Sequence, residues 1–338
     1  MDGSFGGLRS NHPSNSSGIF TISLDFELFW GLRDIMTLEE CRATLLGARR
    51  AIPEILALFA ERGIHATWAT VGFLFCSGRE ELLDSLPEQL PSYSNRSLSP
   101  YAAIAATGDS EREDPLHFAP SLVEQIASHP GQELATHTFS HYYCLEPGQT
   151  IDTFRADLEA AQRIASRRGV ELRSLVFPRN QFNQDYLEVC RELGIVAYRG
   201  NQRSWMYRPT SGEEPAIRRA ARLADAYLNL TGHNGHPAPA PDTGPPVNVP
   251  ASRLLRPVSA PLRALETLRL RRITGEMEHA ARRGLTYHLW WHPHNFGTDV
   301  AANIAFLRRI LEHFEVLEQR YGMRSLNMAE IARRRLPH

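Results

Sequence analysis

The chain has 338 residues, of which 42% are hydrophobic and 22% are charged, the composition of an ordinary globular protein. Its formal net charge is −1, so neither nucleic acid nor an anionic membrane surface is expected as a partner. All 37 basic residues are arginine, which excludes a lysine nucleophile, a Schiff base and a phosphate-binding P-loop lysine.

The four cysteines lie far apart and none forms a CxxC pair, so we expect neither a zinc ribbon nor a disulfide framework. The N-terminal segment, MDGSFGGLRSNHPSNSSG, is polar and lacks the apolar region of a secretory signal. The longest apolar stretch, near ATWATVGFLF, is too short to cross a bilayer. These features predict a cytoplasmic protein without a transmembrane segment.

The predicted elements alternate between strands and helices from the N-terminus onward. Residues 1–18, rich in Gly, Ser and Asn, are expected to form a flexible tail before a single domain at 19–338. A strand at 19–28, IFTISLDFEL, is apolar and becomes acidic at its end. Apolar positions at helical spacing predict a helix over 39–61, followed by a second strand, HATWATV.

Residues 76–118 contain several Pro, Ser and Asn residues and are interpreted as a long insertion. Beyond them the alternation continues to a last short helix. The predicted helices span about 120–128, 151–168, 184–193, 214–230, 261–283 and 300–320, and the further predicted strands are QELATHT, SLVFP, IVAYRG, LTYHLWWH and MRSLNM. The Pro-rich segment GHPAPAPDTGPPVNVP is not expected to join a sheet.

This alternation over almost the whole chain predicts a parallel α/β architecture. No shift in composition divides the chain, so we expect one barrel-like domain with insertions at about 76–118 and 232–252. The insertions could shape a lid or a contact between the subunits of a homo-oligomer. In such barrels the catalytic residues gather where the strands end.

Two carboxylates close the first predicted strand. Asp25 and Glu27 are two residues apart, so on a strand they point to the same side. Carboxylates this close repel each other unless a cation or a proton neutralises them. A solvated strand end is the simpler interpretation, but the surrounding segment, SLDFELFW, is strongly apolar. A functional site is therefore favoured.

A histidine pair, His137 and His141, follows the strand QELATHT. Histidines four residues apart face the same way on a helical turn and can share one cation, although a surface pair has the same spacing. With Glu27 they form the ligand set of a hydrolytic zinc site, which also suits a non-haem Fe(II) oxygenase. Asp25 favours hydrolysis, because a carboxylate beside the metal can accept a proton from the attacking water.

A further histidine, His292, ends the strand LTYHLWWH. It is either a core histidine with a satisfied hydrogen bond or a titratable group that faces Asp25. In the second case the two residues would form a pair of acid and base, in which His292 protonates a leaving amine.

Four segments together resemble the polysaccharide deacetylases, also called carbohydrate esterase family four. They are TISLDFELFWG, ATHTFSH, VFPRNQFN and LWWHPHNFG, and they occur in the family's order between about residues 19 and 330. Other stretches, such as PLHFAP, are similar to the branch found in surface-polysaccharide biosynthesis. The resemblance implies a distorted (β/α)7 barrel with loop insertions and one divalent metal ion, zinc or alternatively cobalt, nickel or iron.

The resemblance also implies roles for individual residues. The implied metal ligands are Glu27, His137 and His141, although many members carry two adjacent aspartates where this chain has D-x-E. Asp25 would be the general base, oriented by Arg179, and His292 the general acid, with His294 as the alternative. Substrate binding is expected from Trp30, Tyr142, Asn180 and His294, and a backbone N–H near Tyr142 or Tyr143 would hold the oxyanion.

The implied activity is removal of an N-acetyl group from an amino sugar, in a polysaccharide or in its lipid-linked or nucleotide-linked precursor. The expected partner is thus an N-acetylated sugar. Two alternatives stay open. The same site could hydrolyse another C–N bond, as a deformylase or cyclic amidase does, or the chain could be an inactive carbohydrate-binding relative.

Overall fold

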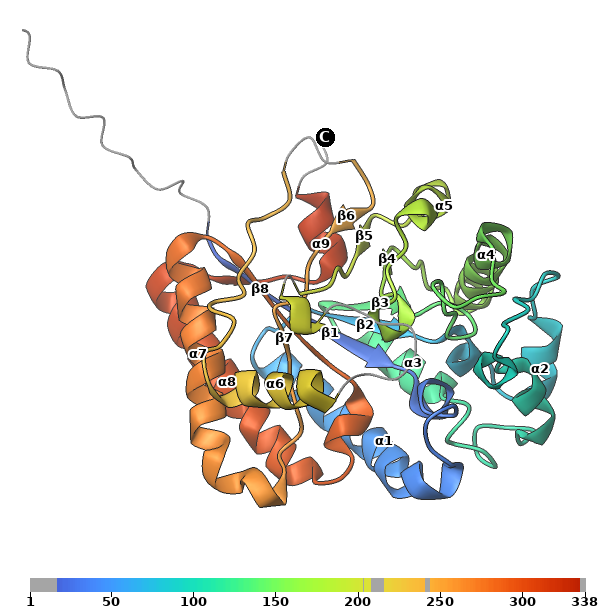
Figure 1. Cartoon of the computed structure of the whole chain (residues 1–338), viewed down its shortest axis with the longest axis horizontal. Helices are drawn as coiled ribbons and strands as arrows, with labels where there is room; N and C mark the ends of the chain where they lie inside the picture. Colours follow the sequence, from blue (N-terminus) through green and yellow to red (C-terminus); the bar gives the residue numbers. More distant parts are fainter. Residues whose placement is uncertain (1–16, 203, 208–215, 241–243, 335–338) are drawn as a thin grey trace, which may run out of the picture.

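The computed structural model describes residues 17–202, 204–207, 216–240 and 244–334 (Figure 1). The predicted tail therefore lies almost wholly outside the described residues. The strands are β1 (Ile19–Phe26), β2 (Ala66–Thr70), β3 (Gln132–Thr136), β4 (Ser174–Leu175), β5 (Ala197–Tyr198), β6 (Val247–Asn248), β7 (Arg253–Leu254), β8 (Thr286–Trp291) and β9 (Arg324–Ser325).

These strands form one curled, parallel sheet in the order β6-β5-β4-β3-β2-β1-β8-β7, and β9 pairs with the start of β1. β6 and β7 are its two edges. Most of the helices lie around the outside of the curve (Figure 1), whereas the last one packs against Ile19 on the inner face. The helices are α1 (Leu38–Glu61), α2 (Arg79–Asp84), α3 (Pro120–Ser128), α4 (Ile151–Arg167), α5 (Leu187–Glu192), α6 (Ala216–Tyr227), α7 (Glu266–Arg283), α8 (Val300–Tyr321) and α9 (Met328–Arg333). The predicted distorted barrel of the deacetylase type is confirmed.

Local sequence signals explain where the long helices begin and end. Thr37 and Glu40 form a capping box at the start of α1, which satisfies free backbone N–H groups there. Asp299 accepts from Ala302 at the start of α8, and Gly322 ends that helix with φ 65°, a conformation that glycine adopts without strain. α1 and α8 match the helices predicted over 39–61 and 300–320.

The alternation of side chains along β1 separates packing from polar chemistry. Its even-numbered side chains, Phe20, Ile22, Leu24 and Phe26, join the large apolar core beneath the helices. The odd-numbered Ser23 and Asp25 are equally buried but make polar contacts on the opposite face, inside the curve of the sheet. Because successive side chains on a strand point to opposite faces, one strand serves both the core and the site.

The Pro-rich segment corrects one expectation. Val247 and Asn248, near its end, form β6, which pairs in parallel with β5 as an edge of the sheet. His236, near its start, makes an isolated bridge with Thr286. The prediction that this segment stays out of the sheet was wrong, because the two non-proline residues beyond its last closely spaced prolines are free to pair at an edge.

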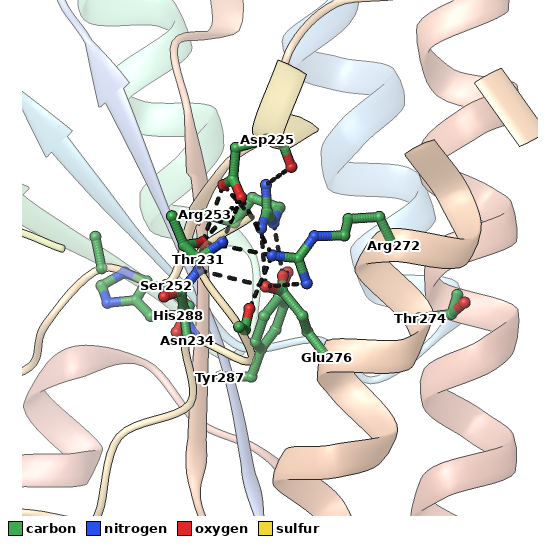
Figure 2. Close-up of polar contacts among 12 residues, drawn as sticks. Asp225, Thr231, Asn234, Ser252, Arg253, Arg272, Thr274, Glu276, Tyr287 and His288 are labelled. Carbon is green, nitrogen blue, oxygen red and sulfur yellow. Dashed lines mark hydrogen bonds and ion pairs between the residues drawn. The ribbon is translucent and has the colours of Figure 1, made fainter. Parts of the chain in front are cut away.

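A buried network of charged side chains fastens α6 to α7 and β7 (Figure 2). Arg253 donates to Glu276 at 2.6 and 2.8 Å, and Arg272 lies 2.9 Å from the same carboxylate. Asp225 lies 3.4 Å from Arg253, and the Tyr287 hydroxyl donates to Glu276 at 2.9 Å. The four charges balance, and each charged side chain is at most 4% exposed. Removing one partner would leave a buried charge without compensation.

Two further expectations concern the class of protein. All four cysteines are buried free thiols. Among the described residues, none of the helices combines the length and hydrophobicity that crossing a membrane requires.

Candidate active site

Polar side chains from the carboxyl ends of several parallel strands meet at one edge of the sheet. They are Asp25 and Glu27 of the β1 segment, His137 after β3, Asn180 after β4, Arg199 after β5 and His292 after β8. In a parallel sheet these ends lie on the same side, where α/β proteins place their binding sites.

The backbone at this edge is held in an unusual conformation. Five non-glycine residues in the described part of the chain have positive φ, between 45° and 63°, and all of them follow β1, β3 or β4: Leu28, Thr138, His141, Arg179 and Asn180. Such residues cost about 1–3 kcal/mol each and persist only where the surroundings impose them. The turns that carry the site are therefore shaped by their surroundings before any ligand arrives.

Three buried side chains form a candidate metal centre. The Oε2 atom of Glu27 lies 3.1 Å from Nε2 of His141 and 3.4 Å from Nε2 of His137. Their ligand atoms all lie within 4.8 Å of one another. Gly31 makes room for this carboxylate, since a methyl group there would come within 2.0 Å of Glu27 Cδ. The predicted ligands are thus brought together.

The hydrogen bonds of the two histidines determine which nitrogen faces Glu27. His137 Nδ1 lies 2.8 Å from the carbonyl of Val176, which can only accept, so Nδ1 carries the proton. His141 Nδ1 lies 3.1 Å from the Tyr143 hydroxyl, which itself donates to Asp34. Both Nε2 lone pairs are therefore directed at a carboxylate oxygen, an arrangement that a cation between them would stabilise.

The electrostatics of the centre agree with this assignment. Burial opposes ionisation of Glu27, but His292, His137 and His141 hold its pKa well below the usual range. Burial lowers the pKa of His141 and so favours the neutral imidazole that a metal requires. The residues present, two imidazoles and one carboxylate, fit a divalent cation such as zinc.

Asp25 is held by a buried arginine that the sequence analysis missed. Arg199 donates to both oxygens of Asp25, at 2.6 and 2.7 Å, and also to Ser23 at 3.0 Å and to Asn180 at 2.9 Å. Its guanidinium stacks on the Trp290 ring, 4.2 Å from the centroid. Burial would raise the pKa of Asp25, but Arg199 outweighs it and keeps the pKa below the ordinary value.

Arg179, which we expected to orient Asp25, does not contact it. Its guanidinium pairs with Asp34 and stacks over Tyr143, 4.6 Å from the ring centroid. The reason is the turn after β4, where the backbone of Arg179 and Asn180 is left-handed and only the Asn180 side chain reaches Arg199.

His292 lies between the two carboxylates. Its Nε2 is 3.7 Å from Asp25 Oδ2 and 3.6 Å from Glu27 Oε1, and its side chain is 26% exposed. The ring of His294 stacks on it with 4.9 Å between centroids and lies deeper. Burial, with His292 nearby, lowers the pKa of His294 to about 4. His294 is therefore neutral near pH 7 and is the weaker candidate for a proton donor.

Two residues expected to bind substrate belong to the core. Trp30 is fully buried, donates to the carbonyl of His117 at 2.8 Å, and packs edge-on against Phe73. The Tyr142 side chain is 1% exposed and its hydroxyl contacts Thr150 and Thr153. Neither ring has a face available for a sugar.

The backbone N–H groups expected to hold an oxyanion are also occupied. Tyr142 N donates to the Thr138 hydroxyl at 2.7 Å, and Tyr143 N donates to the Tyr93 hydroxyl at 2.9 Å. Tyr93 belongs to the insertion 76–118. This insertion therefore packs against the loop that carries His141 and stabilises it. This oxyanion assignment was wrong.

The sequence of the chain matches one family model. Residues 46–198 match the model described as polysaccharide deacetylase. This range includes His137 and His141, whereas Asp25, Glu27 and His292 lie outside it. No curated protein matches the sequence.

Several solved structures share the fold. A candidate polysaccharide deacetylase from Mycobacterium smegmatis has 16% identity and a TM-score of 0.59, with 94% of this chain and 90% of that chain covered. A probable polysaccharide deacetylase from Pseudomonas aeruginosa PAO1 has 12% identity and a TM-score of 0.54, with 93% and 89% covered. PuuE allantoinase has 11% identity and a TM-score of 0.55, with 97% and 93% covered. At these identities the likeness is one of fold, and the sequence itself is similar to the polysaccharide deacetylase family over residues 46–198.

Proposed function

We propose that this protein is a metal-dependent N-deacetylase that hydrolyses the N-acetyl group of an amino sugar. One observation carries the proposal. The Nε2 lone pairs of His137 and His141 converge on Glu27 directly beside an ionised Asp25 and a half-buried His292. That arrangement combines a metal-ligand set, a base and an acid at one point.

Amide hydrolysis needs a metal site, a base and an acid, and different residues supply each of them. A divalent cation held by Glu27, His137 and His141 would polarise the amide carbonyl and lower the pKa of a water beside it. Asp25, kept ionised by Arg199, accepts a proton from the attacking water. His292, whose side chain is 26% exposed, donates a proton to the leaving nitrogen. The products are acetate and a free amino sugar.

The amino sugar belongs, in this proposal, to a surface polysaccharide or to its lipid-linked or nucleotide-linked precursor, and the cation is zinc. Support for the sugar comes from the family match and from the motifs that resemble the biosynthetic branch. Support for zinc comes from the two-histidine, one-carboxylate ligand set. Cobalt, nickel and iron bind similar ligands, so metal analysis decides between them.

The test combines metal analysis with product analysis on the full chain. Purified protein is assayed for bound metal and for release of acetate from a panel of N-acetylated sugars, with formate and ring-opened products measured in parallel. Acetate release that depends on metal supports the proposal. Formate or a ring-opened product would instead identify a deformylase or a cyclic amidase, and no turnover by metal-loaded protein would favour an inactive carbohydrate-binding relative.

Two variants separate chemistry from metal binding. Asp25→Asn should keep the metal and lose most of kcat, because the base no longer accepts a proton. His137→Ala should lose the metal as well. If Asp25→Asn retained nearly the turnover of the wild type, Asp25 would not be the base.

A further inference from the structure

Arg179 lies at the rim of the site with no role in the chemistry proposed above. Its guanidinium stacks on Tyr143, whose hydroxyl is 3.1 Å from Nδ1 of the metal-ligand candidate His141. On its other side the next residue, Asn180, accepts a hydrogen bond from Arg199. One turn thus carries a cationic side chain next to Tyr143 of the candidate metal centre and an amide that contacts the Asp25 assembly.

The Arg179 guanidinium is paired with a buried carboxylate, yet part of the side chain is exposed to solvent. Asp34 engages its Nη2 atom and is only 2% exposed, whereas the Arg179 side chain is 35% exposed. A guanidinium carries five N–H donors, so a pair with one carboxylate oxygen leaves donors for a ligand. The left-handed backbone of Arg179 and Asn180, with φ of 52° and 54°, fixes this presentation at an energetic cost.

A second cationic side chain lies near the pair of Arg179 and Asp34. A second arginine, Arg33, donates to the carbonyls of Ser97 and Leu98 and is close enough to Arg179 and Asp34 to be influenced by both. Burial lowers the pKa of Arg33, and the nearby Arg179 lowers it further. Arg33 is held by backbone carbonyls, and Asp34 forms its ion pair with Arg179.

We propose that Arg179 determines specificity by binding an anionic group, a carboxylate or a phosphate, on the sugar whose N-acyl group is hydrolysed. The fork of N–H groups on a guanidinium matches the oxygens of either anion, and Asp34 and Tyr143 hold it in place. The inference rests on the proposed deacetylase function for its kinetic test, but the binding of the anion can be measured without turnover.

The kinetic test uses three N-acetylglucosamine compounds that differ in charge. They are the neutral methyl glycoside, the methyl glycoside of the corresponding uronic acid, and the 1-phosphate. We expect the wild type to favour a charged compound, and the better of the two charged compounds identifies the anion. Arg179→Gln should reduce kcat/KM for that compound by about 10- to 100-fold, the usual effect of losing a charge-assisted hydrogen bond. The neutral compound should lose much less.

Two controls separate recognition from a structural role. Arg155→Gln removes an arginine of similar exposure, 36%, that pairs with Glu192 between α4 and α5, and should leave the preference for charge unchanged. Arg179→Lys, which keeps the charge without the fork, should retain part of the preference. If Arg179 only supported His141 through Tyr143, then Arg179→Gln would lower metal content and reduce turnover of all three compounds equally, and the inference would be wrong.

Calorimetric binding of the deacetylated products distinguishes this inference from the proposed function. Protein that releases no acetate yet binds the charged amino sugars more tightly than the neutral one, in a manner lost in Arg179→Gln, refutes the function and supports the recognition of an anion. Equal binding and equal turnover of charged and neutral compounds by the wild type overturns the inference.

Discussion

Replacement of Arg199 by methionine tests how the base is kept ionised. The Arg199 side chain is fully buried and the Asp25 side chain is 4% exposed, so the variant leaves a nearly buried carboxylate without its counter-charge. The loss of unfolding free energy has an upper limit, because Asp25 can take up a proton instead of remaining charged. The limit is the free energy of protonating this carboxylate. From an ordinary pKa of 3.8 this cost is about 4 kcal/mol at pH 7, which agrees with the 3–5 kcal/mol typical of a broken buried pair.

The pH dependence of this effect has a definite sign. In the wild type the stabilisation by the pair is present above the ordinary aspartate pKa and is lost as the pH falls through the lower pKa of the folded state. In Arg199→Met burial acts alone and raises the pKa of Asp25. The difference in unfolding free energy between wild type and variant should therefore shrink between pH 7 and pH 4. The acidic limb of the pH–rate profile should move to higher pH, with kcat at neutral pH lower by about 10²- to 10⁴-fold.

Urea unfolding at several pH values and a pH–rate profile provide the measurement. The double variant Asp25→Asn/Arg199→Met is the control, because it removes both charges and should be more stable than Arg199→Met alone. The reasoning is refuted if the unfolding free energy of Arg199→Met lies within about 1 kcal/mol of the wild-type value and the pH–rate profile is unchanged. A buried carboxylate without a counter-charge should destabilise the protein by more than that.

Three further predictions concern the candidate metal centre and the buried charge network. Gly31→Ala pushes the Glu27 carboxylate from its place and should weaken metal binding, measured by competition with a chelator, while circular dichroism shows an intact fold. Chelation should lower the melting temperature of the wild type but not of His137→Ala, because only a protein that binds the metal is stabilised by it; equal shifts would place the metal elsewhere. Glu276→Gln should lower the unfolding free energy by about 3–5 kcal/mol in urea without changing metal content, and a loss under 1 kcal/mol would show that the network in Figure 2 is not compensating charge.

The convergence of the candidate site could be predicted because strand direction is readable from the sequence. Asp25, His137 and His292 each end an apolar segment, and parallel strands bring such ends to one edge. Arg199 ends the segment IVAYRG in the same way, and this was the available signal. The signal is weak, because arginine supplies all 37 basic residues of the chain and its presence at one strand end distinguishes little.

Other errors came from contacts that no local pattern reveals. The N–H of Tyr143 is occupied by the hydroxyl of Tyr93, which is 50 residues away in the sequence. Trp30 lies three residues from a metal-ligand candidate, yet the 3-10 turn Leu28–Gly31 directs its ring into the core. Such outcomes depend on left-handed turns and long-range packing, which neither residue type nor spacing specifies.

The alternation along β1 ties the register of a central strand to catalysis. Insertion or deletion of one residue before Asp25 would exchange the two faces, sending phenylalanines towards the substrate and a carboxylate beneath the helices. Such a change would alter both faces at once, because a shift of the pairing by one residue preserves neither of them. Length variation in this protein should therefore be confined to its loops, and β1 should evolve only by substitution.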